Sequence, residues 1–570
     1  MRLPDPLVPP EPWPGIIARF EQGVAVHPEA MALVTPEVRL TYDALNRRAN
    51  RLANTLLGRG IHPGDVVALG VQDPSWLVAG FLGVLKSGGA VVFLDPKSPP
   101  PRIQEILSDS GAHWRVTAGG PWCGQRLMGH PGGDGAPDPI EVDDLADSAD
   151  ANPVREVTPG ALMLVGYTSG TSGKPRGIRR SLSQGLFEVG TYLGEVPVGP
   201  GDRLLLGMSF TYGASTRFAL SALLSGATLC VAGPETLGME GLVRASRTWA
   251  VTQFYTTPSL FRHFCRAAAA SQAPETLRVV TLMAEPLLSS DLLLFRQLMG
   301  CRGGTLLNSL GSTECGVYCQ FALDSGMTFD GEHPPVGPAV PGKHVFLVDE
   351  NRRPIPAGIP GEIAVSSPYL DQVFWRRPDL DAQLLIPHPE RPGERIFYTG
   401  DLGVLGADGR VRILGRRDAQ VKIRGHRVEP AEIESALCRH PGIRGAVVLA
   451  TSPPGGQRML IAYLQRNPEG ARPSRRDLDR HLLDQLPAYM VPARFLEVDE
   501  FPLTDRGKVD RRALPGVATR PWESTVFGTS VAEDPVMAEV ARLWADLLGA
   551  EPPHSGAGFF EMGGDSIMAM

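Results

Sequence analysis

The first hundred residues alternate between two spacings of apolar positions. Between residues 41 and 60 the apolar side chains recur at steps of three and four, which predicts an amphipathic helix, and residues 16–26 are expected to form another. Residues 65–70 and 90–94 are continuous apolar runs, typical of buried strands, and a further helix is expected between them at 74–87. Strand, helix and strand in this order predict a parallel sheet covered by helices.

The same strand signal returns several times further along the chain. Short, mostly apolar runs lie at 161–165, 203–206, 228–231, 251–255 and 278–282. We therefore expect the α/β class for this part, with a doubly wound sheet.

A change of pattern near Gly415–Asp418 predicts a domain boundary. Before it, residues 363–365, 404–405 and 411–414 have the short alternating spacing of antiparallel strands. After it, helices are expected at 429–438 and 475–485, and strands at 446–450 and 459–464. Residues 516–534 have the aperiodic Pro, Gly, Ser and Thr content of a linker, and a helical stripe resumes at 535–548. The predicted parts are a large lobe (15–415), a small α+β lobe (419–515), a linker (516–534) and a truncated third domain (535–570).

Composition narrows the class of protein. A chain of 570 residues is too long for one compact core, and its 43% hydrophobic content argues against a disordered protein. The 65 Gly and 53 Pro residues follow no triplet period, so they predict many loops rather than collagen. The net charge of −7 comes without a long basic stripe, which argues against nucleic acid as the main partner.

Cysteine usage and apolar runs bear on location. The seven cysteines are scattered and lack zinc-site spacing, which indicates structural or incidental thiols in a reducing compartment. No uninterrupted apolar run reaches the ~20 residues of a membrane span, and the Pro-rich first 14 residues lack an apolar signal core. We therefore expect a cytoplasmic protein without a membrane partner.

Residues 167–177 carry the strongest local signal for chemistry. They read Tyr-Thr-Ser-Gly-Thr-Ser-Gly-Lys-Pro-Arg-Gly and follow the strand expected at 161–165. Glycines let backbone N–H groups point inward, hydroxyls add donors, and Lys and Arg add positive charge, which together suit polyphosphate oxygens. The run lacks the Walker spacing, and a plain flexible loop is the alternative. The candidate phosphate-binding residues are Thr168, Ser169, Gly170, Thr171, Ser172, Gly173 and Lys174.

This run resembles the phosphate loop of the adenylate-forming superfamily, and specifically of the adenylation domains of nonribosomal peptide synthetases. Four further motifs follow at family-like spacings: Asn-Ser-Leu-Gly-Ser-Thr-Glu at 308–314, Tyr-Thr-Gly-Asp at 398–401, Gly-Arg-Arg-Asp-Ala-Gln-Val-Lys-Ile-Arg-Gly at 415–425 and Pro-Leu-Thr-Asp-Arg-Gly-Lys-Val-Asp at 502–510. The resemblance covers about residues 15–515. It implies a large lobe with a small β-barrel-like part, a mobile small lobe, and ATP-dependent activation of a carboxylic acid as an acyl-adenylate.

The resemblance also implies roles for single residues. Asp401 matches the aspartate that binds both ribose hydroxyls, and Glu314 matches a catalytic glutamate associated with Mg²⁺. Lys508 matches the catalytic lysine that bridges the substrate carboxylate and the α-phosphate. In this family the small lobe rotates between an adenylation pose and a thiolation pose, and Lys422 matches a lysine that serves the thiolation pose. Asp418 matches the hinge between the two poses. The remaining ATP-site residues implied are Asn308, Gly311, Thr313 and Arg416. Without the joint pattern, each charge would be an ordinary surface residue.

The last residues resemble the start of a peptidyl carrier protein. Residues 559–566 read Phe-Phe-Glu-Met-Gly-Gly-Asp-Ser, and Ser566 matches the serine that receives phosphopantetheine; an N-cap is its ordinary role. The expected partners are the acid, an own or downstream carrier domain, and a small activating protein as a further candidate. Because no condensation-type domain precedes residue 15, an initiating or stand-alone loading module is expected if Met1 is the native start.

The family's pocket pattern also marks residues for binding the acid. Where members that activate α-amino acids place an aspartate, this chain has Thr211, which cannot pair with an ammonium group. We therefore expect an aryl, hydroxy, keto or unusual amino acid. The assignment crosses a two-residue length difference between Thr211 and Gly226. The pocket residues implied are Thr211, Tyr212, Ser215, Tyr255, Thr281, Met283, Ser309, Val317 and Tyr318.

Four other interpretations stay open. The pocket residues could be ordinary core, or three of the tyrosines could form an aromatic cage for a cation. The enzyme could be a free acyl-CoA ligase instead of a ligase that loads a carrier. A catalytically silent docking module is the fourth alternative, which the intact Lys174, Glu314, Asp401 and Lys508 oppose.

Overall fold

The protein forms two compact units. The computed structural model describes residues 15–118, 139–155, 157–169, 175–210, 213–271, 273–329, 331, 333–370, 372–418, 420–423, 425–451, 458–502, 509–522, 539–540 and 542–543. The first unit comprises Met1–Pro96, Ile103–Thr168 and Arg176–Asp418, and the second comprises Lys97–Arg102, Ser169–Pro175 and Ala419–Met570.

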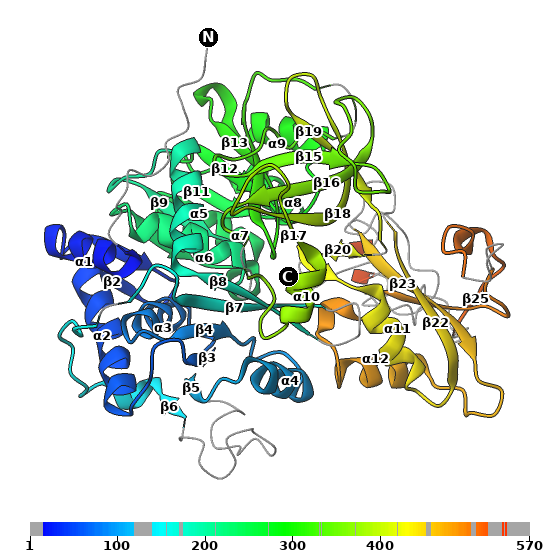
Figure 1. Ribbon diagram of the computed structural model, residues 1–570, viewed down its shortest axis with the longest axis horizontal. Coiled ribbons are helices and arrows are strands. Elements are labelled where there is room, and N and C mark those ends of the chain that lie inside the picture. The colour runs from blue at the N-terminus through cyan, green and yellow to red at the C-terminus, as the bar shows by residue number, and fades with distance from the viewer. Residues whose placement is uncertain are drawn as a thin grey trace. The chain divides into compact units, whose positions relative to one another are not determined.

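A six-stranded sheet lies in the first unit (Figure 1), in the order β6-β5-β3-β4-β7-β8. Its strands are parallel except for the last pair, and the apolar runs of β3 and β4 are almost entirely buried, as a sheet covered on both faces requires. The strands are β3 (Val66–Gly70), β4 (Ala90–Phe93), β5 (Trp114–Thr117), β6 (Ile140–Glu141), β7 (Leu162–Thr168) and β8 (Arg176–Ser181). Because Thr168 of β7 pairs with Arg176 of β8, the Gly/Ser/Thr-rich run connects two antiparallel strands.

An eight-stranded sheet in the same unit has the order β14-β13-β12-β11-β9-β10-β1-β2. Its inner strands are parallel, and both outer pairs are antiparallel. The strands are β1 (Met31–Val34), β2 (Arg39–Thr41), β9 (Arg203–Leu206), β10 (Thr228–Val231), β11 (Gln253–Thr256), β12 (Val279–Leu282), β13 (Thr305–Ser312) and β14 (Gly316–Asp324).

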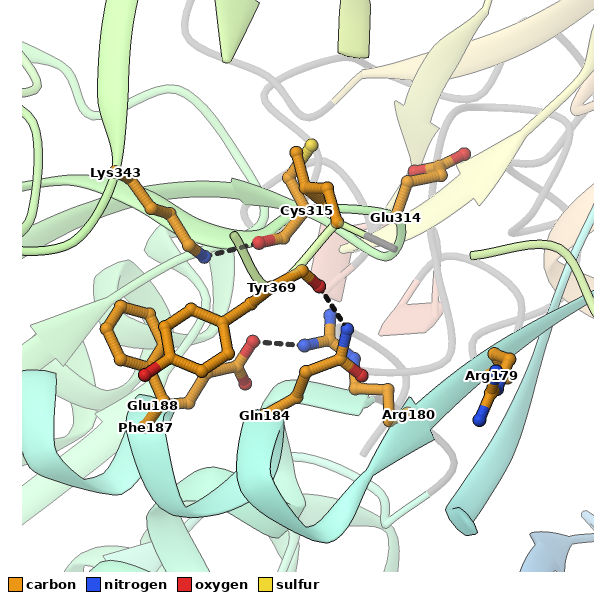
Figure 2. A pocket seen from close by; sticks show the side chains of 10 residues that line it. Arg179, Arg180, Gln184, Phe187, Glu188, Glu314, Cys315, Lys343 and Tyr369 are labelled. Carbon is orange, nitrogen blue, oxygen red and sulfur yellow. Dashed lines mark hydrogen bonds and ion pairs between the residues drawn. The ribbon is translucent and has the colours of Figure 1, made fainter. Parts of the chain in front are cut away.

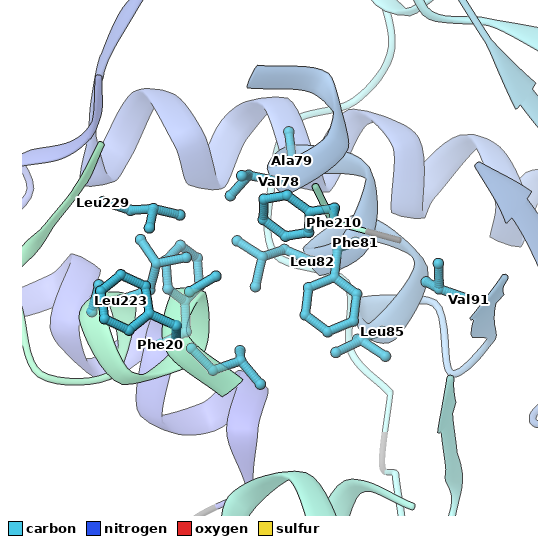
Figure 3. Close-up of a cluster of buried hydrophobic side chains, with 14 of the residues drawn as sticks. Phe20, Val78, Ala79, Phe81, Leu82, Leu85, Val91, Phe210, Leu223 and Leu229 are labelled. Carbon is cyan, nitrogen blue, oxygen red and sulfur yellow. The ribbon is translucent and has the colours of Figure 1, made fainter. Parts of the chain in front are cut away.

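Helices follow the strands of both sheets. Thr41 caps α2 by accepting from the Ala44 N–H, and Ser181 and Gln184 form a capping box that starts α5. Figure 3 shows Phe20, Phe81 and Leu223 converging in one buried apolar cluster. The helices of this part are α1 (Ile16–Val26), α2 (Tyr42–Gly58), α3 (Pro74–Lys86), α4 (Pro100–Ser110), α5 (Leu182–Glu195), α6 (Gly213–Leu223), α7 (Pro234–Thr248), α8 (Pro258–Ser271) and α9 (Ser289–Met299), with 3₁₀ turns at Val142–Leu145 and Gly300–Arg302.

A third sheet completes the first unit. It has five strands, all antiparallel, with the order β15-β16-β18-β17 and β19 paired to β18. This sheet is the part expected to be barrel-like. Its elements are β15 (His344–Val348), β16 (Gly361–Ser367), α10 (Pro378–Leu384), β17 (Leu385–Pro387), β18 (Arg395–Leu405) and β19 (Val411–Arg416).

The second unit is α+β. It contains a two-stranded and a four-stranded sheet, the latter in the order β22-β23-β24-β25. Ile433, Val448, Leu464 and Leu478 contribute to its own apolar core. Its elements are β20 (Val421–Ile423), β21 (His426–Val428), α11 (Pro430–Cys438), β22 (Ile443–Thr451), β23 (Met459–Arg466), α12 (Arg475–Leu483), β24 (Arg494–Glu497) and β25 (Arg520–Pro521), with 3₁₀ turns at Ala488–Met490 and Leu514–Gly516.

The expected fold class is confirmed: a large α/β lobe with parallel sheets is followed by a smaller α+β lobe. Of the helix expected at 535–548, only residues 539–540 and 542–543 are described, and they are helical. The linker beyond residue 522 and the whole carrier signature lie outside the described residues. Within the described part of the chain, no helix combines the length and apolar character that a membrane crossing needs.

Candidate active site

Asp401 and Arg416 form the centre of the predicted ribose site. They lie opposite each other in the antiparallel pair of β18 and β19, and Arg416 Nη1 donates to Asp401 Oδ1 at 2.6 Å. The same guanidinium donates from Nε and Nη2 to the two carboxylate oxygens of Asp418, at 2.7 and 2.8 Å. Arg416 therefore links the predicted ribose-binding carboxylate to the predicted hinge residue.

The backbone at Gly400 makes this arrangement possible. Gly400 has φ +75°, and a Cβ atom built there would lie 2.6 Å from Arg416 Nη2. Burial by itself lowers the pKa of Arg416, but hydrogen bonds and charge from Asp418 and Asp401 outweigh it and raise the pKa above its usual value. The guanidinium is therefore a permanent cation at this site.

Tyr318 holds the second oxygen of Asp401. Its hydroxyl, on β14, donates to Asp401 Oδ2 at 2.9 Å, and its ring is fully buried. Burial raises the pKa of Tyr318 well above its usual value, and the Asp401 charge acts in the same direction. A carboxylate offers about four acceptor positions, and protein donors take two of them here, so two hydroxyl groups of a ligand can still be accepted.

The turn between β13 and β14 carries Glu314. Asn308, on β13, donates its side-chain amide to the Pro335 carbonyl, and a Cβ at Gly311 would lie 2.6 Å from the Gly316 carbonyl oxygen, so glycine is needed there. Thr313 accepts at its carbonyl oxygen from Arg180 Nη2 at 2.8 Å. Figure 2 shows the Glu314 carboxylate directed away from Lys343 and Cys315.

Glu314 can contribute to a magnesium site only together with a ligand. Among the residues that the structure describes, no three His, Cys, Asp or Glu side chains gather as a metal-binding group. Mg²⁺ is commonly held by one or two carboxylates together with substrate phosphates and water. A single buried glutamate near the predicted ribose site fits that pattern, whereas a cage made of protein side chains alone does not.

A buried polar cluster supports the Glu314 turn from behind (Figure 2). Arg180 and Glu188 form an ion pair, and Lys343 Nζ donates to the carbonyl oxygens of Cys315 and Val317, the latter at 2.8 Å. Burial is the main cause that lowers the pKa of Lys343 to about 8; the charges of Arg180 and Arg217 act in the same direction, and that of Glu188 opposes them. The cluster fixes the backbone between Thr313 and Val317, and the sequence analysis did not identify it.

Three of the predicted acid-pocket residues lie together at β11 and β12, Tyr255 and Thr281 on the strands and Met283 directly after β12. Tyr255 and Thr281 are opposite each other in the parallel pair, and the Tyr255 hydroxyl donates to the Met283 sulfur at 2.9 Å. The Thr281 hydroxyl lies 3.3 Å from the Tyr192 hydroxyl. These residues form one buried wall at the carboxyl ends of neighbouring strands, where open α/β sheets bind ligands.

The other described pocket residues are buried as well. Ser215 donates its hydroxyl to the Ser209 carbonyl oxygen at 2.7 Å, and Ser309 accepts from the Gln320 amide at 3.2 Å. Val317 packs in the main apolar cluster. Because the Ser215 hydroxyl already bonds the backbone, this side chain has little left to offer a ligand.

Sequence reasoning missed Arg217, two positions after Ser215 on α6. Its side chain is 1% exposed and lies over the Tyr192 ring, with Cζ 5.3 Å from the ring centroid. A cation next to Tyr255 and Tyr192 disfavours the aromatic-cage alternative, because a positively charged ligand would be repelled. Two features of the sequence could have pointed to Arg217. It is the single charge in the mostly apolar stretch 217–224, and it lies in the region between Thr211 and Gly226 where the length differs from the family pattern.

Several predicted residues fall elsewhere. Thr168 ends β7, and Ser169 follows it and is buried. Lys422 lies on β20 of the second unit, paired with Arg427. The predicted site residues outside the described part of the chain are Gly170, Thr171, Ser172, Gly173, Lys174, Thr211, Tyr212, Lys508 and Ser566.

Two family models match most of the chain. The family model described as "AMP-binding enzyme" matches residues 20–375, and "AMP-binding enzyme C-terminal domain" matches residues 432–508. A linear gramicidin synthase protein of Brevibacillus parabrevis is 35% identical over 96% of this chain, and phosphinothricin tripeptide synthetase PhsC of Streptomyces viridochromogenes is 34% identical over 96%. The chain spans 7% and 49% of the lengths of these two proteins.

Solved structures share the fold. An artificially fused adenylation–PCP di-domain from Klebsiella oxytoca is 23% identical, with a TM-score of 0.72, over 84% of this chain and 93% of that chain. At this identity the likeness concerns the fold alone.

Proposed function

The chain belongs to the AMP-binding enzyme family, and we propose that it activates a carboxylic acid with ATP and passes the acyl group to a carrier domain in nonribosomal peptide synthesis. The observation that carries the proposal is the Asp401 carboxylate, oriented at both oxygens by Arg416 and Tyr318, with two acceptor positions left for ribose hydroxyls. Synthetases of linear gramicidin and of phosphinothricin tripeptide are among its relatives.

In the proposed first step a carboxylate oxygen of the acid attacks the α-phosphorus of ATP. A bond forms between this oxygen and the α-phosphorus. The bond between the α-phosphorus and the oxygen that bridges it to the β-phosphorus breaks, and pyrophosphate leaves with the bridging oxygen. Both reactants are anions, so the site has to align them and neutralise charge rather than supply a nucleophile. Asp401 orients the ribose, and Arg416 adds positive charge beside it.

Glu314 would hold Mg²⁺ together with the phosphates, and the ion would neutralise charge on the leaving pyrophosphate. The Lys343 and Arg180 contacts to the backbone around residue 315 keep Glu314 in place. Lys508 and the phosphate-loop residues Thr168–Lys174 are proposed to contact the α-phosphate and the polyphosphate, as the family's motifs imply. Lys422 and the hinge residue Asp418 are proposed to serve the second step.

In the proposed second step a thiol attacks the acyl carbon and a C–S bond forms, while the C–O bond between the acyl carbon and AMP breaks; AMP leaves with that oxygen, and the thiol proton is released to solvent. The thiol is phosphopantetheine on a carrier domain, with Ser566 as the attachment site on this chain; a small activating protein remains a candidate partner. Thr211 in place of an aspartate supports an aryl, hydroxy, keto or unusual amino acid as substrate.

Acid-dependent exchange of labelled pyrophosphate into ATP tests the first step across a panel of acids. We expect exchange with at least one acid of the proposed classes and none without acid. Thioester formation, measured with a phosphopantetheinylated carrier and with free CoA, tests the second step. Preferential acylation of CoA would favour the acyl-CoA ligase, and no exchange with any acid would contradict the proposed activity.

A further inference from the structure

Arg217 is a buried cation without an ion-pair partner among the described residues. It lies on α6, its side chain is 1% exposed, and none of its three guanidinium nitrogens makes a hydrogen bond of standard geometry there, although it interacts with the Tyr255 hydroxyl. A buried polar group ordinarily finds partners, and a buried charge costs several kcal/mol or more when it has none. This makes Arg217 an exception that calls for a physical reason.

Aromatic side chains lie next to this guanidinium, close to the predicted acid pocket. Arg217 lies over the Tyr192 ring, and Phe218, next to it on α6, stacks on Tyr255 at a centroid distance of 4.6 Å. Burial raises the pKa of Tyr255 and of Tyr192, and the charge of Arg217 opposes that shift in both. Tyr255 in turn bonds Met283, so Arg217 lies at the wall formed by β11 and β12.

The negative charge near Arg217 is already paired with another cation. Glu188 is an acidic group whose charge acts on Tyr255 and Lys343, and its carboxylate is paired with Arg180. Lys343 adds a second buried cation whose pKa Arg217 helps to lower. Residues 211 and 212, just before α6, are Thr and Tyr and carry no carboxylate. The pocket wall therefore has an excess of buried positive charge.

We propose that Arg217 binds a second carboxylate of the substrate, so that the acid activated is a dicarboxylic acid. A guanidinium presents two parallel N–H donors that match the two oxygens of a carboxylate. Binding would supply the counter-charge that the free pocket lacks. This inference rests on the proposed function, since it assigns the substrate class of the same pocket.

Matched acids test this inference. Exchange of pyrophosphate into ATP is measured with succinate, glutarate, adipate and benzene dicarboxylates, each beside its monoamide, which has nearly the same shape without the second charge. For the preferred chain length we expect kcat/KM to be about a hundredfold higher for the diacid than for its monoamide, as for a buried charge pair. Arg217→Met should remove most of this preference, and Arg217→Lys, which keeps the charge without the planar fork, should keep part of it.

Arg278→Met serves as the matched control, because Arg278 is 43% exposed and pairs with Asp202. It should leave the preference unchanged. Equal or faster exchange with the monoamides in the wild type, or an undiminished preference in Arg217→Met, would overturn the inference while leaving adenylation intact. If Arg217→Met does not fold, the wild-type ratio and Arg217→Lys still decide. No exchange with any acid, neutral or charged, would overturn the proposed function and this inference with it.

Discussion

Arg416 lies opposite Asp401 in the ladder of β18 and β19, and a 2.6 Å hydrogen bond joins Nη1 to Oδ1. The strand pairing therefore delivers the contact without help from a loop. Sites built on regular elements hold their geometry more precisely than sites on loops. The Asp401 carboxylate is accordingly oriented before any nucleotide arrives.

Replacing Asp401 with Asn should weaken nucleotide binding. The change removes the charge that Arg416 and Tyr318 orient, and charge-assisted hydrogen bonds are worth about 1.5–3 kcal/mol, so we expect the Kd for ATP to rise about ten- to a hundredfold. Isothermal titration calorimetry measures it. Asp408→Asn is the control, because Asp408 also pairs with an arginine, Arg410, but is exposed in the turn that joins β18 and β19. Equal ATP affinity in the wild type and Asp401→Asn would contradict the assignment.

Gly400→Ala should disturb the same site through the backbone. The new Cβ would lie 2.6 Å from Arg416 Nη2, and the alanine would have to adopt the left-handed backbone conformation of Gly400. Gly409→Ala is a close control, because Gly409 has the same φ of +75° but nothing within 4 Å of its Cβ. Both should lose about 1–2 kcal/mol of stability from backbone strain, and only Gly400→Ala should also lose ATP affinity. Equal ATP affinity in the two variants would refute the role of the Arg416 contact.

The free energy of unfolding should rise between pH 8 and pH 10.5 because of Lys343. Burial lowers its pKa from 10.5 to about 8, so in this window the unfolded lysine keeps its proton while the folded one loses it. The unfolded state then binds more protons, and the contribution reaches about 3 kcal/mol at the upper end. Denaturant titrations across this range should show a smaller slope with pH for Lys343→Met. Identical slopes would mean that Lys343 stays charged.

Replacing either of two buried arginines with Met should change the stability of the substrate-free protein, in opposite directions for the two sites. Arg217→Met removes an uncompensated charge and should raise stability by about 1–4 kcal/mol, whereas Arg180→Met strands Glu188 and should lower it by about 3–5 kcal/mol. Thermal unfolding of the two variants beside the wild type measures both effects. Destabilisation by both substitutions would show that Arg217 has a partner in the free protein.

The sequence predicts local elements better than their assembly. The strands at 203–206 and 228–231 and the helix at 16–26 match the structure to the residue, because each is a short apolar run or a regular stripe with clear ends. The strand expected at 251–255 begins two residues later. The parallel strands divide into two sheets because of pairing between segments that are distant in the sequence. The local spacing of apolar residues does not predict such pairing.

For the candidate site, too, the sequence predicts local features better than contacts between distant segments. Motifs locate Asp401 and Arg416, whose spacing places them opposite each other in one hairpin. The Tyr318 hydroxyl, assigned to the acid pocket, bonds Asp401, because β14 and β18 are brought together only by the fold. Arg217 escaped notice because the two-residue length difference between Thr211 and Gly226 blurs the family's pocket pattern there, and no local rule predicts a buried guanidinium.

Isotope transfer tests the central claim, that a carboxylate oxygen of the acid becomes bonded to the α-phosphorus of ATP. The wild-type enzyme is given ATP, a thiol acceptor and an acid labelled with ¹⁸O in its carboxylate, and the nucleotide products are analysed by mass spectrometry. Acyl-adenylate chemistry predicts AMP that carries one ¹⁸O atom, and unlabelled pyrophosphate. ADP with labelled inorganic phosphate, or AMP without the label, would contradict the account.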